Sequence, residues 1–130
     1  MSFVYLDTSV ALAQLLAEDR TPPPQLWKER LISSKLLEYE TWTRIHSRKL
    51  GRSHSDAVRL LLGRISTVEM ISTILTRATE PFPGSVRTLD ALHLATILFL
   101  QEGGQQLSLA SYDENMTKVA RALKIGIYKL

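Results

Sequence analysis

The 130-residue chain contains no cysteine. Without thiols it can form neither a disulfide nor a thiolate metal site. No apolar run is long enough to cross a bilayer, and the N-terminus lacks the basic segment and apolar core of a signal peptide. We therefore expect a cytoplasmic protein with no membrane association.

Several sequence motifs of known chemistry are also missing. There is no G-x-S-x-G motif, no Walker-type glycine loop, no H-E-x-x-H motif and no Cys/His cluster. These absences argue against a serine hydrolase, a P-loop nucleotide site and a zinc centre. The net charge of +3 is compatible with a nucleic-acid partner but does not require one.

The composition and length fit one globular domain over residues 1–130, with 45% hydrophobic and 22% charged residues. Short apolar runs alternate with longer helical patterns, which predicts an α/β fold with a central parallel sheet and helices on both faces. The expected strands are 3–6, 31–34, 67–72, 106–111 and 126–130. The expected helices are 8–19, 23–30, 35–50, 53–65, 71–82, 88–102 and 113–124. We expect Thr8 or Ser9, Ser53 and Thr88 to act as N-caps, and Gly51 and the pair 103–104 to end helices.

Four acidic residues occupy related positions in this pattern. Asp7 and Asp113 each follow a strand, whereas Glu40 lies in an early turn of its helix and Asp90 in the first turn of another. In an open parallel sheet, the strands end and the connecting helices begin at the same edge. The topology therefore predicts that all four carboxylates converge there.

Each acid also has a purely structural explanation. Asp90 lies near a helix N-terminus, where the helix dipole favours negative charge, and Asp7 and Asp113 could be simple helix caps. Glu38 and Glu40 lie on different faces of one helix, and the periodicity favours Glu40 without excluding Glu38.

Basic residues and histidines give weaker signals. The segment "RIHSRKLGRSH" is either a solvated face or a strip that contacts phosphates. Its candidate RNA-binding residues are Arg44, Arg48, Lys49 and Arg52. His93 follows Asp90 by one helical turn, and a buried, hydrogen-bonded histidine is the expected arrangement.

Four segments occur in a telling order: "LDTSVAL", "LLEYETWTRI", "RTLDALHLATIL" and "ASYDENM". Together they resemble the PIN-domain family, and within it the VapC-type toxins of prokaryotic toxin–antitoxin pairs. The resemblance implies a Mg²⁺- or Mn²⁺-dependent endoribonuclease that hydrolyses RNA to 5′-phosphate and 3′-hydroxyl ends. It implies that the catalytic, metal-binding acids are Asp7, Glu40, Asp90 and Asp113. We expect supporting hydrogen bonds from Thr8, Ser9 and Ser111.

The same resemblance implies a homodimer and a cognate antitoxin that inserts residues into the acidic cleft. Two alternatives within the family stay open: a nuclease of RNA processing or DNA metabolism, and a PIN-like module that binds without cutting. A haloacid-dehalogenase-like phosphohydrolase is disfavoured because Ser9 stands where its second acid would be needed. A phospho-receiver domain is disfavoured because the paired acids near its first strand are absent.

Overall fold

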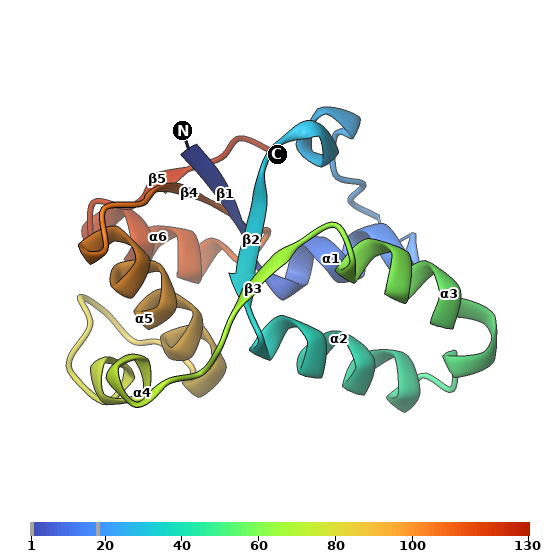
Figure 1. Ribbon diagram of the computed structural model, residues 1–130, viewed down its shortest axis with the longest axis horizontal. Helices are drawn as coiled ribbons and strands as arrows, with labels where there is room; N and C mark the ends of the chain where they lie inside the picture. The colour runs from blue at the N-terminus through green and yellow to red at the C-terminus, as the bar shows by residue number, and fades with distance from the viewer. Residues whose placement is uncertain (1, 18) are drawn as a thin grey trace.

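A five-stranded parallel sheet forms the centre of the protein, and the computed structural model describes residues 2–17 and 19–130 (Figure 1). The strand order is β3-β2-β1-β4-β5, and every neighbouring pair is parallel. The strands are β1 (Ser2–Leu6), β2 (Leu31–Ser34), β3 (Ser66–Val68), β4 (Gln106–Ala110) and β5 (Gly126–Ile127). The expected α/β fold with a parallel sheet is therefore confirmed.

The strand order contains a topological switch point. From β1 the chain builds outward through β2 to β3, and it then crosses to the other side of β1 to add β4 and β5. At such a switch the connections leave β1 and β4 in opposite directions, which opens a crevice beyond their carboxyl ends. This crevice is the expected place for a functional site.

The helices and the 3₁₀ segment cover both faces of the sheet. They are α1 (Thr8–Leu16), η1 (Pro24–Lys28), α2 (Leu36–Ser47), α3 (Gly51–Leu62), α4 (Ser72–Ala78), α5 (Thr88–Glu102) and α6 (Glu114–Ala122). Figure 1 shows α1, α2 and α3 gathered on one side of the sheet and α4, α5 and α6 on the other.

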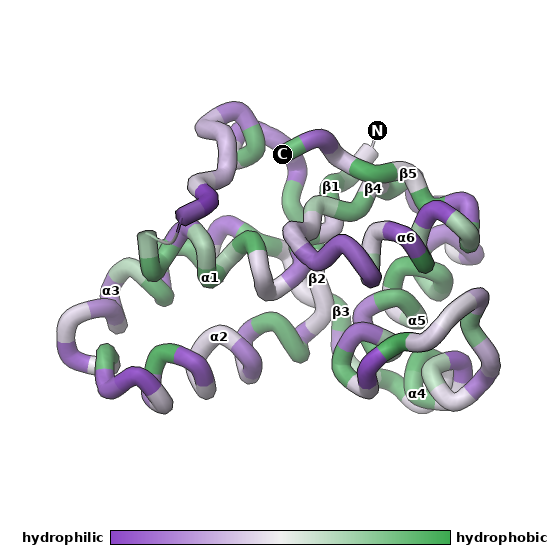
Figure 2. The backbone as a smooth tube through the Cα atoms, turned by 180° about the vertical axis from the view of Figure 1, so that it is seen from behind, coloured by the Kyte–Doolittle hydropathy of each residue, from purple (hydrophilic) through white to green (hydrophobic). Residues whose placement is uncertain are grey.

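Strand alternation divides the core into two. Val4 and Leu6 of β1 pack into a cluster with residues of α1, α2 and α3, whereas Tyr5 points to the opposite cluster with residues of α5 and α6. Successive side chains of a strand point to opposite faces, so a central strand needs apolar residues at every position. Figure 2 shows the mainly apolar colouring of β1 and of much of α5.

Helix α5 runs from Thr88 to Glu102 as predicted, and Gly103 follows it with Gly104 in the left-handed region. Its buried residues include Leu94, Ala95 and Ile97. A helix that is apolar on nearly all sides must pack on several neighbours at once. Among the described residues, however, no helix is both long and apolar enough to cross a bilayer.

The predicted helix starts were wrong in detail. Asp7, not Thr8 or Ser9, holds the N-cap position of α1, and its side chain makes no capping bond there. Arg87 holds that position for α5, so Thr88 is the first helical residue. The hydroxyls of Thr8 and Ser9 are instead bonded to carboxylates, which removes them from capping.

The boundary between α2 and α3 was also wrong. Helix α2 ends at Ser47, Lys49 takes up the left-handed conformation in the turn, and Gly51 begins α3. Ser53 lies inside α3 and donates to the carbonyl of Leu50. A lysine thus supplies the positive φ that we had expected a glycine to provide.

The remaining boundaries differ by a few residues. Helix α1 ends at Leu16, and the predicted extension to residue 19 includes residue 18, which lies outside the described residues. Strand β3 covers 66–68 rather than 67–72, and the segment at 24–28 is a 3₁₀ helix. Such short elements at the sheet margin depend on tertiary pairing more than on local pattern.

Candidate functional site

Asp7 and Ser111 meet at the carboxyl ends of the two strands that flank the switch point. Leu6 and Ala110 are paired in register, and the Asp7 amide donates to the Ala110 carbonyl at 3.0 Å. The sheet therefore brings together residues that are 104 positions apart. Asp7 is only 5% exposed, so its carboxylate is held within the crevice rather than at its rim.

Two serine hydroxyls fix one oxygen of Asp7. Ser9 Oγ donates to Asp7 Oδ2 at 2.6 Å, and Ser111 Oγ donates to the same oxygen at 2.8 Å. Both hydroxyls also accept a backbone N–H, from Tyr112 and Asp113 respectively, each at 3.0 Å. Because each hydroxyl accepts one bond and donates the other, the Asp7 side chain is oriented, and no described residue donates a hydrogen bond to its Oδ1.

Glu40 is held in the same way. Thr8 Oγ1 donates to Glu40 Oε1 at 2.8 Å, and His93 Nε2 lies 2.6 Å from that oxygen. Both contacts fall on Oε1, and among the described residues Oε2 accepts no hydrogen bond. The pocket next to it is lined by Glu40, Arg87 and Asp90 together with residues 88 and 89.

A buried chain of hydrogen bonds stands behind Glu40. His93 is fully buried, and its Nδ1 lies 2.7 Å from the hydroxyl of Tyr5. A carboxylate can only accept, so Nε2 carries the proton, and Nδ1 accepts from Tyr5. Burial raises the pKa of Tyr5, so its hydroxyl stays protonated and able to donate. Neither the role of Tyr5 nor the His93–Glu40 contact was predicted, because the three residues lie on different elements.

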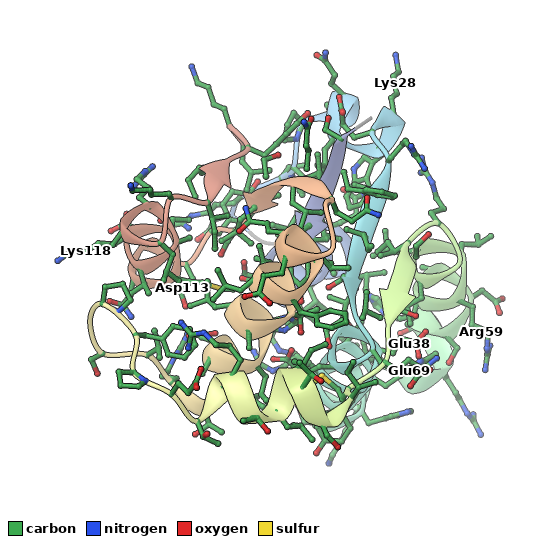
Figure 3. The ribbon with its side chains drawn as sticks, turned by 60° about the vertical axis from the view of Figure 1, so that its left-hand side comes forward. Lys28, Glu38, Arg59, Glu69, Asp113 and Lys118 are labelled. Atoms are coloured by element: carbon green, nitrogen blue, oxygen red, sulfur yellow. The ribbon has the colours of Figure 1, made fainter. Side chains whose placement is uncertain are left out.

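Glu38 does not belong to this network. It forms a salt bridge with Lys35 at 2.9 Å, and its side chain is partly exposed. Figure 3 shows Glu38 beside Glu69 and well away from Asp113. Of the two glutamates that periodicity left open, Glu40 is the one that lines a pocket with another of the four acids, Asp90.

Arg87 joins the other two acids. Its Nε donates to Asp90 Oδ2 at 3.0 Å, and its Nη2 donates to Asp113 Oδ2. Asp113 Oδ1 accepts from the Met116 amide at 3.0 Å, so this residue caps α6 and also faces the crevice. Arg87 begins the quoted segment "RTLDALHLATIL", but nothing in its local pattern marked it as a contact of two acids.

The negative charge of Asp90 is disfavoured by burial and by other acids, and only Arg87 opposes this effect. Asp90 is 8% exposed, and burial raises its pKa, with the charges of Asp113 and Asp7 adding to the rise and Arg87 opposing it. The hydrogen bond with Asp90 in turn raises the pKa of Arg87. Asp90 thus interacts with both Asp7 and Asp113, which places three of the acids within electrostatic range of one another.

The donor types suit a hard divalent cation. Carboxylate and hydroxyl oxygens surround the crevice, and both ring nitrogens of His93 are already committed. Over residues 2–17 and 19–130, no three His, Asp or Glu side chains are close enough to form a ready-made metal cage. The guanidinium of Arg87 lies between two of the acids, so these acids have a cationic partner within the chain itself.

The basic segment divides into two parts. Arg44 lines a cavity together with Ser9 and Asp113, so it lies beside the crevice. Arg48 and Lys49 lie in the turn after α2, and Arg52 lies in the first turn of α3. Arg20 lines the same cavity as Arg44 and was not singled out from the sequence, because it lies in an irregular segment.

Comparisons with known proteins agree on the family. The PIN domain model matches residues 4–122. Ribonuclease VapC35 of Mycobacterium tuberculosis is 29% identical over 130 residues, covering 95% of this chain and 94% of that protein. Ribonuclease VapC46 of the same organism is 28% identical over 131 residues, covering 98% and 97%.

The fold has a solved counterpart as well. The crystal structure of Mycobacterium tuberculosis VapC20, described as a toxin that cleaves the sarcin–ricin loop, superposes with a TM-score of 0.68. The match covers 88% of this chain and 93% of that chain at 19% identity. With a family model spanning most of its length and relatives of matching size, the chain belongs to the PIN domain family.

Proposed function

We propose that this protein is a divalent-metal-dependent endoribonuclease, and that it is the toxin of a toxin–antitoxin pair. The observation that carries the proposal is the position of Asp90, which feels the charges of Asp7 and Asp113 and lines one pocket with Glu40, beside the switch point of the sheet. The family membership and the ribonuclease relatives support RNA as the substrate.

The chain's residues suit hydrolysis of a phosphodiester. Asp7, Asp90, Asp113 and Glu40 would hold Mg²⁺ or Mn²⁺, which supplies positive charge for the phosphate and the leaving oxygen and acidifies water. Ser9 and Ser111 hold Asp7 in one orientation, and Thr8 and His93 hold Glu40. The available Glu40 Oε2 would position the attacking water, and the products would carry 5′-phosphate and 3′-hydroxyl ends.

The partners follow from the toxin relationship. A cognate antitoxin would occupy the acidic crevice and silence the enzyme, the chain would pair as a homodimer, and the RNA would be met in the cytoplasm. A cation placed between Asp90 and Asp113 by a partner would compete with Arg87 for the same oxygens.

The test compares cleavage of a mixed RNA pool with and without metal. The wild-type protein should cut in Mn²⁺ or Mg²⁺ and stop in EDTA. The Asp7→Asn variant should lose at least about a hundredfold in rate, because it removes a carboxylate that would hold the metal ion. Asp56→Asn is the matched control, since Asp56 is fully exposed on α3.

Two results would overturn the proposal. One is cleavage by Asp7→Asn at the wild-type rate, and the other is no cleavage of any RNA with either metal. Cleavage assays with single-stranded and with duplex DNA test the alternative role in DNA metabolism. A folded protein that binds RNA without cutting would support the non-cleaving module instead.

A further inference from the structure

A cavity of about 380 Å³ opens beside the acidic crevice. Ser9 and Asp113 belong to both, so the cavity continues directly from the place where the carboxylates gather. Its volume falls in the range of roughly 300–1,000 Å³ that small organic groups occupy in proteins. It therefore has room for one nucleotide unit next to the proposed site of cleavage.

Two arginines line this cavity. Arg44 projects from α2 and is exposed, and across the described residues its side chain has no salt-bridge partner. Arg20 reaches in from the segment after α1, where its Nη1 donates to the Tyr112 carbonyl at 3.0 Å. Its guanidinium also lies 5.4 Å from the centre of the Tyr112 ring. Arg20 is thus held in position, whereas Arg44 is an available cation.

The remaining wall has a mixed character. Leu12 and Ala13, both buried on α1, form an apolar floor, and Asp19 contributes one negative charge. Asp113 is already paired with Arg87, so its charge is compensated from the crevice side. The two arginines therefore outweigh Asp19, and the cavity offers positive charge beside an apolar surface.

We propose that this cavity, the Arg20–Arg44 subsite, binds one nucleotide of single-stranded RNA beside the scissile bond. The phosphate lies on Arg44 and Arg20, because guanidinium groups pair with phosphate oxygens through two parallel hydrogen bonds. The sugar and base lie against Leu12 and Ala13. This inference rests on the proposed ribonuclease function, since it assigns the adjacent crevice to the cleavage step.

The test measures binding apart from cleavage. A fluorescein-labelled single-stranded RNA oligonucleotide is titrated with protein in EDTA, and anisotropy gives Kd at several KCl concentrations. We expect Arg44→Ala to raise Kd by about fivefold to tenfold. The slope of log K against log salt should become shallower by about 0.7, the value for one phosphate contact on a single strand.

Arg121→Ala is the matched control. Arg121 lies on α6, is also exposed and has no salt-bridge partner among the described residues, but it does not line the cavity. It should leave both Kd and the salt slope near the wild-type values. Arg20→Ala should weaken binding as Arg44→Ala does, and melting curves should show that all three variants remain folded.

Kinetics in Mn²⁺ provides the second readout. A residue that holds substrate uniformly should raise KM and leave kcat near the wild-type value. If Arg44→Ala and Arg121→Ala change binding equally, or if wild-type protein does not bind the RNA, the proposed subsite is contradicted. Competition of inorganic phosphate and of mixed mononucleotides against the labelled RNA tests whether the apolar floor contributes to binding. If phosphate and mononucleotides displace the RNA equally well, the cavity binds a phosphate group alone and the proposed nucleotide subsite is contradicted.

The two proposals fail separately. RNA binding that depends on Arg44, without cleavage in any metal, leaves the subsite standing and removes the ribonuclease function. Normal cleavage with unchanged Kd and KM in Arg44→Ala removes the subsite and leaves the function intact.

Discussion

Asp90 is a carboxylate placed where its surroundings disfavour its charge. Burial is the main cause of its raised pKa, and the nearby charges of Asp113 and Asp7 add to it. The folded state therefore binds a proton at Asp90 more tightly than the unfolded chain does. The stability contributed by Asp90 is complete below its ordinary pKa and is lost as the pH rises through the folded value.

This sign leads to a prediction for Asp90→Asn in EDTA. The variant should melt at a higher temperature than wild type at pH 7, because a neutral amide escapes the desolvation and repulsion. Near pH 3.5 the difference should vanish, since wild-type Asp90 is then protonated. Differential scanning calorimetry at the two pH values measures this, with Asp56→Asn as the exposed control. An equal gain at both pH values would contradict the electrostatic explanation.

Arg87 is the second residue, and its ion pairs should affect how tightly the protein binds a divalent cation. Its side chain is 77% exposed, so its ion pairs with Asp90 and Asp113 are those of a surface group, worth roughly 1 kcal/mol together. A divalent cation held by Asp90 and Asp113, as proposed, would displace the guanidinium from these oxygens. Arg87→Ala should therefore bind Mn²⁺ about fivefold more tightly than wild type.

Calorimetric titration or Mn²⁺ electron paramagnetic resonance measures that affinity without any substrate. Arg77→Ala is the control, since Arg77 lies on α4 and pairs with Glu80, just beyond the end of that helix. Weaker Mn²⁺ binding in Arg87→Ala than in wild type would show that Arg87 supports the site instead of competing for it.

At the scale of elements, the N-cap residue of α6, Asp113, makes two different kinds of contact. Asp113 Oδ1 caps the helix through the Met116 amide, and Oδ2 faces Arg87 and the crevice. Asparagine caps a helix about as well as aspartate, whereas alanine loses roughly 1 kcal/mol. Substitution by asparagine and by alanine can therefore separate the contribution of Asp113 to helix capping from its proposed role in cleavage.

We predict that Asp113→Asn keeps the free energy of unfolding within about 0.5 kcal/mol of wild type, and that Asp113→Ala loses about 1 kcal/mol. Both variants should lose RNA cleavage. Urea unfolding and a cleavage assay together measure the two effects. If Asp113→Asn unfolds as readily as Asp113→Ala, the cap at α6 is not what stabilises this helix.

Elements also explain how Glu40 is held. Strand β1 supplies Tyr5, α5 supplies His93, and the start of α1 supplies Thr8, so three elements converge on one carboxylate of α2. Such a network stays in place only while the sheet and both helix layers are packed. The orientation of Glu40 is thus a property of the assembled fold rather than of α2.

At the scale of the whole molecule, the candidate ligands come from four segments that are far apart in the sequence, so the site exists only in the folded chain. A ligand that binds the folded state alone stabilises it by about 2.7 kcal/mol at a hundred times its Kd. Mn²⁺ or Mg²⁺ should therefore raise the melting temperature of wild-type protein in proportion to the logarithm of its concentration, and EDTA should reverse the shift.

The matched variants make this test specific. Asp7→Asn should show a much smaller metal-dependent shift, and Asp56→Asn should behave as wild type. A shift of the same size in all three proteins would indicate metal binding elsewhere on the surface.

Much of the architecture was predictable because it follows from local pattern. The strand–helix alternation required a parallel sheet, and the apolar run at 88–102 marked α5 to the residue. The expectation that Asp7 and Asp113 lie at one edge needed only the rule that parallel strands end together. The prediction of the boundary between α2 and α3 was wrong because Lys49, rather than Gly51, adopts the left-handed conformation.

By itself, then, the sequence determined the fold class, the position of α5 and the set of acids that follow strands or begin helices. Only the tertiary structure decided that Glu40 rather than Glu38 faces the crevice, that His93 and Tyr5 hold it, and that Arg87 joins Asp90 to Asp113. The physical reason is sequence separation. Periodicity describes contacts within a turn or a strand, whereas these hydrogen bonds join side chains from elements that only tertiary packing brings together.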